Sequence, residues 1–175
     1  MSIIVRRATT NDINEIACLY DDLNDYLAEH ENYPRWKKGV YPSREHAEEA
    51  LAAGELYVAV INEKVAGTVV YSAEQGEAYQ SVAWQIEYDV PVIVICKLAV
   101  HPEFLGCGVG KALLDYAAIL GKKQGAKAIR LDTYVENFPA ARLYEKCGYK
   151  NMGLVDLGLE EIYGLKWYKV YEKVL

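Results

Sequence analysis

Residues 105–111, LGCGVGK, have the composition and the position of a phosphate-binding loop. They follow an apolar, β-branched run typical of a buried strand, and they precede a segment with helical periodicity. Glycines permit a tight turn and a close approach of the backbone to a ligand. The N–H groups and the dipole of a helix start favour a phosphate or pyrophosphate there. The spacing therefore predicts an anion-binding loop, with a plain tight turn into the helix as the alternative.

Two well-known phosphate loops do not match this stretch. A dinucleotide fingerprint, GxGxxG, requires a third glycine where Lys111 or Leu113 stands. A P-loop, GxxxxGK[ST], requires Ser or Thr where Ala112 stands and Gly where Leu105 stands. Neither nucleotide-binding fold is supported.

The elements that position the loop alternate between strand and helix periods. The predicted strands cover residues 3–6, 56–61, 65–71, 92–100, 128–134, 149–155 and 165–174. The predicted helices cover residues 9–29, 44–53 and 140–146, the first opened by a capping box of Thr9 and Asp12. A further helix after the glycine loop carries Ala112, Leu113, Tyr116, Ala117 and Leu120 and is closed by Gly121 or Gly125. Residues 30–42 read as a loop, and residues 73–90 fit no period. The order βααβββαβαββ, without repeats or linkers, predicts an α/β fold with a single mixed sheet in one domain over residues 1–175.

Charge and composition exclude several classes of protein. Lys and Arg number 19 against 25 Asp and Glu, a net charge of −6, which argues against a nucleic-acid partner. No apolar run approaches the ~18 residues needed to span a bilayer, and the early charges rule out a signal peptide. The four cysteines are scattered, so we expect no metal and a reducing compartment. We therefore expect a soluble cytoplasmic protein with no membrane partner.

Two longer motifs carry a family resemblance. Residues 98–114 read LAVHPEFLGCGVGKALL, and Asn137, Ala140, Tyr144, Gly148 and Tyr149 fit the pattern NxxAxxxYxxxGF. In this order they resemble the two signatures of the GCN5-related N-acetyltransferase (GNAT) family, whose loop reads [Q/R]xxGx[G/A]. The order of elements resembles the fold of that family over essentially the whole chain.

The resemblance implies acetyl-CoA as a cosubstrate and assigns its contacts. Backbone groups at the end of the strand, and the Asn137 side chain, would hold the pantetheine arm. The N–H groups of residues 106–111 would hold the pyrophosphate. Tyr144 would stand near the thioester sulfur. The implied cofactor-binding residues are Leu98, Ala99, Val100, Leu105, Gly106, Cys107, Gly108, Val109, Gly110, Lys111, Asn137 and Tyr144. Leu105 replaces the usual Gln or Arg, so we expect a weaker or altered pyrophosphate contact. The alternatives are a helix cap for Asn137 and helix packing for Tyr144.

Acetyl transfer to an amine requires a proton acceptor and a proton donor. An amine with a pKa near 10.4 is free base in roughly one molecule of 2,500 at pH 7, about 4.6 kcal/mol uphill. Glu87 and Asp89, before the central strand, are candidate bases, with Glu29 behind them and a water chain as the alternative. Tyr144 is the candidate donor to the departing thiolate. A cysteine nucleophile is disfavoured, because no histidine pairs with Cys96 or Cys107.

The acceptor is the least defined partner. Trp36 and Tyr41, between the first two helices, could form an aromatic pocket for an amine, with Glu29 as a further substrate-binding residue, or could simply pack under a loop. A small amine, an aminoglycoside, an amino acid or a protein amine all fit. A non-catalytic acyl-CoA sensor and a longer acyl donor are the alternative functions. The terminal strands and residues 163–171 predict a homodimer.

Overall fold

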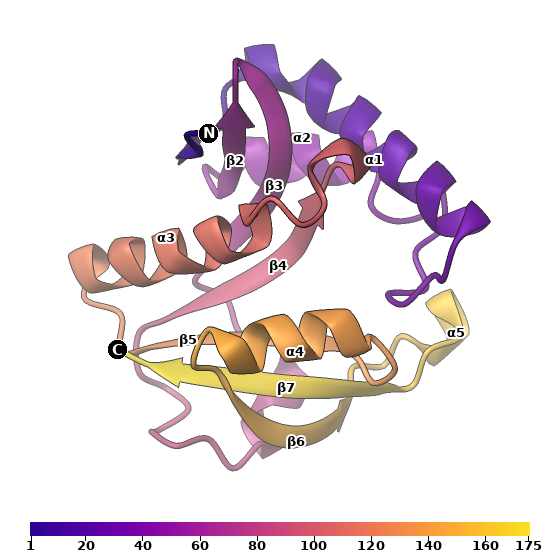
Figure 1. The fold of residues 1–175 in the computed structure, drawn as a ribbon. Helices are drawn as coiled ribbons and strands as arrows, with labels where there is room; N and C mark the ends of the chain where they lie inside the picture. Colours follow the sequence, from indigo (N-terminus) through magenta and orange to yellow (C-terminus); the bar gives the residue numbers. More distant parts are fainter. The chain divides into compact units, whose positions relative to one another are not determined.

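The computed structural model describes residues 1–175 and contains seven strands. They are β1 (Ile4–Arg7), β2 (Leu56–Ile61), β3 (Lys64–Ser72), β4 (Val92–Val100), β5 (Ala128–Tyr134), β6 (Lys150–Asp156) and β7 (Trp167–Val174) (Figure 1). Their hydrogen-bonded order is β1-β2-β3-β4-β5-β7-β6. β4 and β5 are parallel, whereas the pairs β1–β2, β2–β3, β5–β7 and β6–β7 are antiparallel. The prediction of a single mixed sheet is confirmed.

The helices are α1 (Ile13–Glu29), α2 (Arg44–Ala52), α3 (Val109–Gln124), α4 (Phe138–Lys146) and the short α5 (Glu160–Tyr163). The chain also contains three 3-10 turns, η1 (Thr10–Asp12) before α1, η2 (Glu77–Ser81) between β3 and β4, and η3 (Pro102–Phe104) between β4 and α3. The chain forms two compact units, of which the first comprises Met1–Tyr71 and Cys96–Tyr116, and the second Ser72–Ile95 and Ala117–Leu175. That residues 1–175 form one domain stays a prediction.

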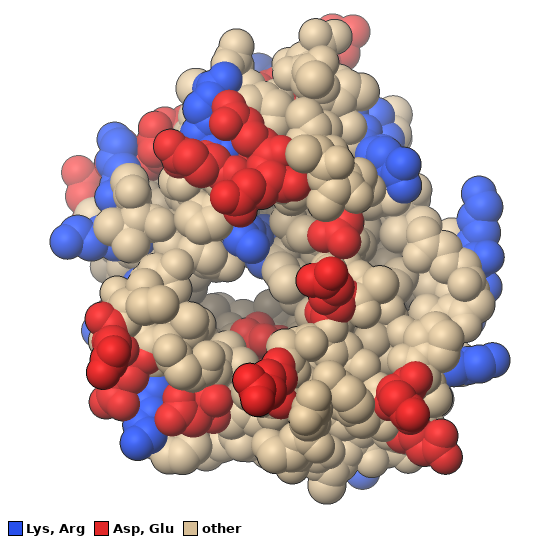
Figure 2. Space-filling model, turned by 180° about the vertical axis from the view of Figure 1, so that it is seen from behind, with Lys and Arg blue, Asp and Glu red and all other residues tan.

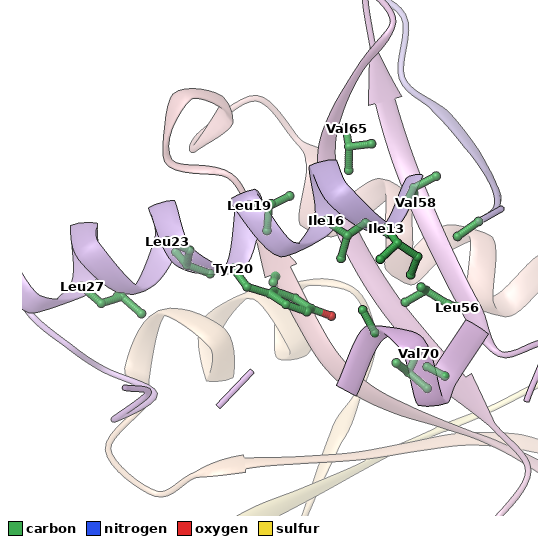
Figure 3. Close-up of a cluster of buried hydrophobic side chains, with 14 residues drawn as sticks. Ile13, Ile16, Leu19, Tyr20, Leu23, Leu27, Leu56, Val58, Val65 and Val70 are labelled. Atoms are coloured by element: carbon green, nitrogen blue, oxygen red, sulfur yellow. The ribbon is translucent and has the colours of Figure 1, made fainter. Parts of the chain in front are cut away.

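In the first unit, α1 and α2 cover the β2–β3 hairpin. The predicted capping box opens η1, which leads directly into α1, and in it the Thr9 N–H donates to Asp12 Oδ2 at 2.7 Å. From there the apolar side chains follow the helical period, and Ile16 and Tyr20 point toward Leu56 (Figure 3). These three side chains are at most 1% exposed. Burial of this one face of α1 orients the helix on the hairpin.

In the second unit, α4 lies along β7 (Figure 1). Its one buried aromatic side chain, Tyr144, makes an edge contact with Tyr171 of β7, with ring centroids 5.5 Å apart. The unit also holds the segment between β3 and β4, which fits no period in the sequence. That segment is anchored by Arg130 of β5, whose guanidinium is fully buried and bonds three of its backbone carbonyls.

Of the two glycines predicted to close α3, Gly125 is the one that does so. The helix begins at Val109 and continues through Gly121 to Gln124, and Gly125 follows it with φ +78°. Gly121 stays inside the helix because the space beside it is filled. A Cβ there would lie 2.7 Å from Leu175 Cδ1 and 3.3 Å from Ile93 Cδ1, so glycine is retained for packing.

The surface carries both signs of charge. On the face that Figure 2 shows, acidic and basic side chains are interspersed, and no continuous basic patch covers it. None of the helices combines the length and the apolar character that a bilayer crossing requires.

Candidate functional site

The glycine loop of the first unit has the geometry that an anion site requires. Gly106 and Gly108 adopt φ +77° and +84°, and no atom lies within 4 Å of the position that a Cβ would take at either residue. The first hydrogen bond of α3 runs from the Ala112 N–H to the Gly108 carbonyl, at 3.0 Å. The amides of Val109 and Gly110, before it, therefore have no acceptor within the helix. They are the groups that a pyrophosphate could use.

Close packing on β3 holds the start of α3. A Cβ at Gly67 would lie 2.6 Å from Val109 Cγ1 and 3.1 Å from the Ala99 carbonyl, so only glycine allows this approach. One turn further along, the Tyr71 hydroxyl donates to the Leu113 carbonyl at 2.6 Å. The helix start cannot shift without breaking these contacts.

The other predicted loop residues have distinct surroundings. Leu105 directs a 47% exposed side chain to solvent, so at this position only the backbone is built into the turn. The Cys107 thiol lies 3.9 Å from the Leu105 carbonyl and is half-buried, with no histidine partner among its contacts. Lys111 forms an ion pair with Asp115 one turn along α3. The Cys107 N–H donates to the Phe104 carbonyl at 3.2 Å, so the amides of Val109 and Gly110 are the candidate anion-binding groups of the loop.

The end of β4 contains a strained residue. Lys97 adopts φ +52°, a left-handed conformation that is rare for a non-glycine residue inside a strand. Leu98, Ala99 and Val100 follow it, and Ala99 is buried while its two neighbours are half-buried. Strain of this kind costs on the order of 1–3 kcal/mol and persists where the surrounding structure enforces it, often at functional sites.

Asn137 and Tyr144 both belong to α4 of the second unit. Asn137 caps the helix, since its Oδ1 accepts from the Ala140 N–H at 3.4 Å, and its Nδ2 donates to Thr133 Oγ1 at 3.0 Å. The capping alternative is therefore realised, and a pantetheine contact stays a prediction. Tyr144 is 7% exposed, and its ring contacts Tyr149 and Tyr171. Burial, with a smaller contribution from Asp132, raises the pKa of Tyr144 well above the ordinary value of 10.0, so the phenol stays protonated.

Glu87 and Asp89 lie just before β4. Both side chains are exposed, and Glu87 lines a cavity of about 500 Å³ together with Lys127 and Leu175 at the chain end. Their assignment as bases stays a prediction, with a water chain as the alternative.

Trp36 and Tyr41 are brought together in the first unit. Their ring centroids are 5.8 Å apart in an edge arrangement. Asn32 holds the turn, with its Nδ2 donating to the Trp36 carbonyl at 2.7 Å, and Asn24 donates to the Tyr41 carbonyl at 3.3 Å. Trp36 also packs on the apolar core beneath it. Glu29 is exposed at the end of α1, and its role in substrate binding stays a prediction.

Sequence reasoning missed two residues beside Tyr41. His46 of α2 and Lys97 of β4 both contact the Tyr41 ring, at 4.9 Å and 5.6 Å from its centroid. The available signal was Lys97 itself, a lysine inside an otherwise apolar nine-residue strand. His46 had no such signal, because a histidine in the first turn of a helix is common on surfaces.

Known proteins resemble the chain in sequence and in fold. The model of the Acetyltransferase (GNAT) family matches residues 17–149, and the chain belongs to this family. An N-alpha-acetyltransferase of Sulfurisphaera tokodaii is 29% identical over 154 residues, which cover 85% of this chain and 80% of that protein. The UPF0157 protein YqkA of Bacillus subtilis is 33% identical over 64 residues. These cover 37% of this chain but only 18% of YqkA, so the match spans less than a fifth of that protein.

A solved structure supports the same fold. An acetyltransferase of the GNAT family from Streptococcus agalactiae 2603 superposes with a TM-score of 0.76 at 20% identity, over 99% of this chain and 95% of that one. The predicted GNAT fold is thereby confirmed.

Proposed function

We propose that this protein transfers the acetyl group of acetyl-CoA to a primary amine, by direct attack of the amine within a ternary complex. The observation that carries the proposal is the glycine loop of the first unit. After Gly106 and Gly108, the amides of Val109 and Gly110 at the start of α3 lack acceptors in the helix. The space beside the two glycines is open. Together with membership of the GNAT family, this geometry supports the loop as the binding site for the pyrophosphate of acetyl-CoA.

The reaction removes protons from nitrogen and supplies one to sulfur. A protonated amine first loses one proton, and its nitrogen then forms a bond to the acetyl carbonyl carbon and loses a second. The carbon–sulfur bond breaks to release the thiolate of coenzyme A, which takes up one proton. Tyr144 can protonate the departing sulfur, because burial keeps its phenol neutral. Glu87, Asp89 or a water chain would accept protons from the amine.

Calorimetric titration with acetyl-CoA tests the loop. We expect Gly108→Asp to weaken binding roughly ten- to hundredfold, because its carboxylate would stand where the pyrophosphate binds. Gly158→Asp is the matched control, since Gly158 has a similar φ of +73° and equally open space. Equal binding by wild type and Gly108→Asp would place the nucleotide elsewhere.

Thiol release in the presence of amines tests the transfer. We expect Tyr144→Phe to lower kcat by roughly 10²-fold or more if the hydroxyl protonates the thiolate. Tyr171→Phe is the matched control, because its buried hydroxyl lacks a partner and its ring contacts Tyr144. Unchanged turnover by Tyr144→Phe would remove it as the acid. Binding without any amine-dependent release would favour the alternative of a non-catalytic acyl-CoA sensor.

The name of the Sulfurisphaera relative, N-alpha-acetyltransferase, adds one acceptor class for the assay. An α-amine at a peptide terminus or on a free amino acid belongs in the panel beside lysine-like amines. An α-amine has a pKa near 8, so neutralising it costs less than neutralising a lysine side chain.

A further inference from the structure

Three side chains of the first unit surround one aromatic ring. Tyr41 lies at the centre, with Trp36 at 5.8 Å and His46 at 4.9 Å between ring centroids, and with the Lys97 ammonium 5.6 Å from its centroid. We call these four residues the Tyr41 cluster. They come from the loop after α1, from α2 and from β4, so the fold and not the local sequence assembles them.

Lys97 is a charge without a counter-charge. Its side chain is half-buried, and no carboxylate lies within 4 Å of its ammonium group. Two other lysines of this unit are paired, since Lys38 bonds Asp25 at 2.9 Å and Lys111 bonds Asp115. A half-buried ammonium that has only an aromatic face as its partner is poorly compensated, so an anion brought to it would be bound favourably.

His46 adds a second donor to the Tyr41 cluster. Its Nδ1 accepts the Ser43 backbone N–H at 3.0 Å, and this leaves the proton of the neutral ring on Nε2. Burial, followed by the charge of Lys97, lowers the pKa of His46 below 6.5, against a smaller opposing effect of Glu49 and Glu45. Near neutral pH the ring is therefore uncharged and presents an Nε2–H group.

The position of Lys97 connects this cluster to the transfer site. Lys97 immediately precedes Leu98, so their Cα atoms are about 3.8 Å apart. Its backbone is left-handed, at φ +52°. This conformation is strained for lysine, and it would be strained for leucine, alanine or valine at the same position as well. The ammonium thus stands within one side-chain length of the strand segment assigned to the pantetheine arm.

We propose that the Tyr41 cluster is an acceptor subsite that binds a carboxylate, so that the substrate is an amine carrying a carboxylate a few bonds from its nitrogen. This inference rests on the proposed acetyl transfer. Lys97 would bind the carboxylate as an ion pair, His46 would donate through Nε2, and Trp36 and Tyr41 would flank the carbon skeleton. An acceptor with only positive charge would meet the Lys97 ammonium unfavourably. The same carboxylate is found on a free amino acid or on an acidic residue at a peptide N-terminus.

Binding of acetylated products tests the subsite without requiring turnover. Calorimetry in the presence of coenzyme A would compare N-acetylglycine with N-acetylglycinamide, a pair that differs only in carboxylate against carboxamide. A second pair, N-acetylated aspartyl and asparaginyl dipeptide amides, distinguishes the peptide source from the free amino acid. We expect the carboxylate of at least one pair to bind roughly ten- to hundredfold more tightly, as for a charge-assisted hydrogen bond.

Variants assign the preference to the cluster. Lys97→Met should abolish the preference, Lys97→Arg should retain most of it, and Lys38→Met, an exposed lysine of the same unit, should leave it unchanged. A circular dichroism melt of each variant checks folding. Equal binding of carboxylate and carboxamide in both pairs, or a preference that survives Lys97→Met, overturns the inference.

Turnover separates this inference from the proposed function. If no amine causes thiol release, the transferase proposal fails, while the binding comparison still decides whether the Tyr41 cluster recognises a carboxylate. If thiol release occurs, we expect Lys97→Met to raise the KM of carboxylate-bearing amines roughly tenfold or more. Turnover that favours amines without a carboxylate would overturn the inference and leave the transferase proposal intact.

Discussion

Replacing Arg130 by Met should destabilise the protein severely, because the guanidinium holds together a fully buried network. Arg130 and Glu172 are both 0% exposed, and their ion pair measures 2.8 Å. The remaining donors of Arg130 bond Gln75 Oε1 at 2.7 Å and the backbone carbonyls of Tyr88, Glu87 and Ile86 at 3.0, 2.8 and 3.2 Å. The Trp84 ring lies 4.5 Å from the guanidinium carbon and covers it.

The expected loss follows from what remains after the substitution. Met has a similar length and fills most of the space, so the cavity is small. Glu172 keeps one bond, from the Gln85 N–H at 2.7 Å, but its charge is then buried without a partner. Breaking a buried pair in this way costs about 3–5 kcal/mol, a large fraction of the 5–15 kcal/mol that stabilises a typical protein. The carbonyls at residues 86–88 also lose their donors.

Urea unfolding of single and double variants measures the network. We expect Arg130→Met to lose about 3–5 kcal/mol, and Arg130→Met combined with Glu172→Met to recover part of it, because the second change removes the unpaired charge. The exposed pair Arg44–Glu48, an i,i+4 contact at 2.9 Å, is the matched control. Arg44→Met should cost at most about 0.5 kcal/mol.

Protease sensitivity gives a second readout of the same substitution. If Arg130 anchors residues 72–91, its loss should open that segment to cleavage before the protein unfolds globally. An Arg130→Met protein within 1 kcal/mol of wild type, or one whose segment 72–91 resists cleavage as well as wild type does, would refute the assignment of Arg130 as the anchor.

Three further outcomes follow from contacts elsewhere. Gly67→Ala should lower the free energy of unfolding by roughly 1–3 kcal/mol and weaken acetyl-CoA binding, because its Cβ would lie 2.6 Å from Val109 Cγ1. Gly76→Ala is the control, since its Cβ would meet no atom within 4 Å. Urea unfolding and calorimetry check both variants. The Arg6 guanidinium lowers the pKa of Asp12 below 3.8 in the folded protein. The ionised Asp12 carboxylate therefore contributes fully to stability above pH 3.8, and this contribution is lost as the pH falls through the pKa of Asp12 in the folded state. Asp12→Asn should flatten that part of the stability–pH curve, measured by urea unfolding. Gel filtration should show a homodimer that Trp167→Glu weakens, since Trp167 is 47% exposed in the C-terminal strand; a monomer in wild type would contradict this.

The fold was largely predictable from local patterns. β2, β4 and β5 have the predicted bounds, because their strand periods end at Gly, Pro or polar turns that leave little choice of register. The sequence pattern left two possible ends for α3, Gly121 and Gly125. The helix passes through Gly121, since a helix interior tolerates glycine where its neighbours fill the space of a side chain. Residues 73–90 resisted prediction for a related reason. Their order depends on Arg130, more than 40 positions away, and not on a period of their own.

The candidate site shows the same division between local and distant information. The glycine loop was visible as a motif because one contiguous stretch supplies its turn, its amides and its helix. The Tyr41 cluster could not be found in this way, since its members are separated by 61 positions from Trp36 to Lys97. Only the left-handed backbone of Lys97 and its approach to Tyr41 reveal a charge placed beside an aromatic wall. A family motif therefore predicts the donor of the acetyl group, whereas the acceptor subsite that we propose consists of side chains that become neighbours only after folding.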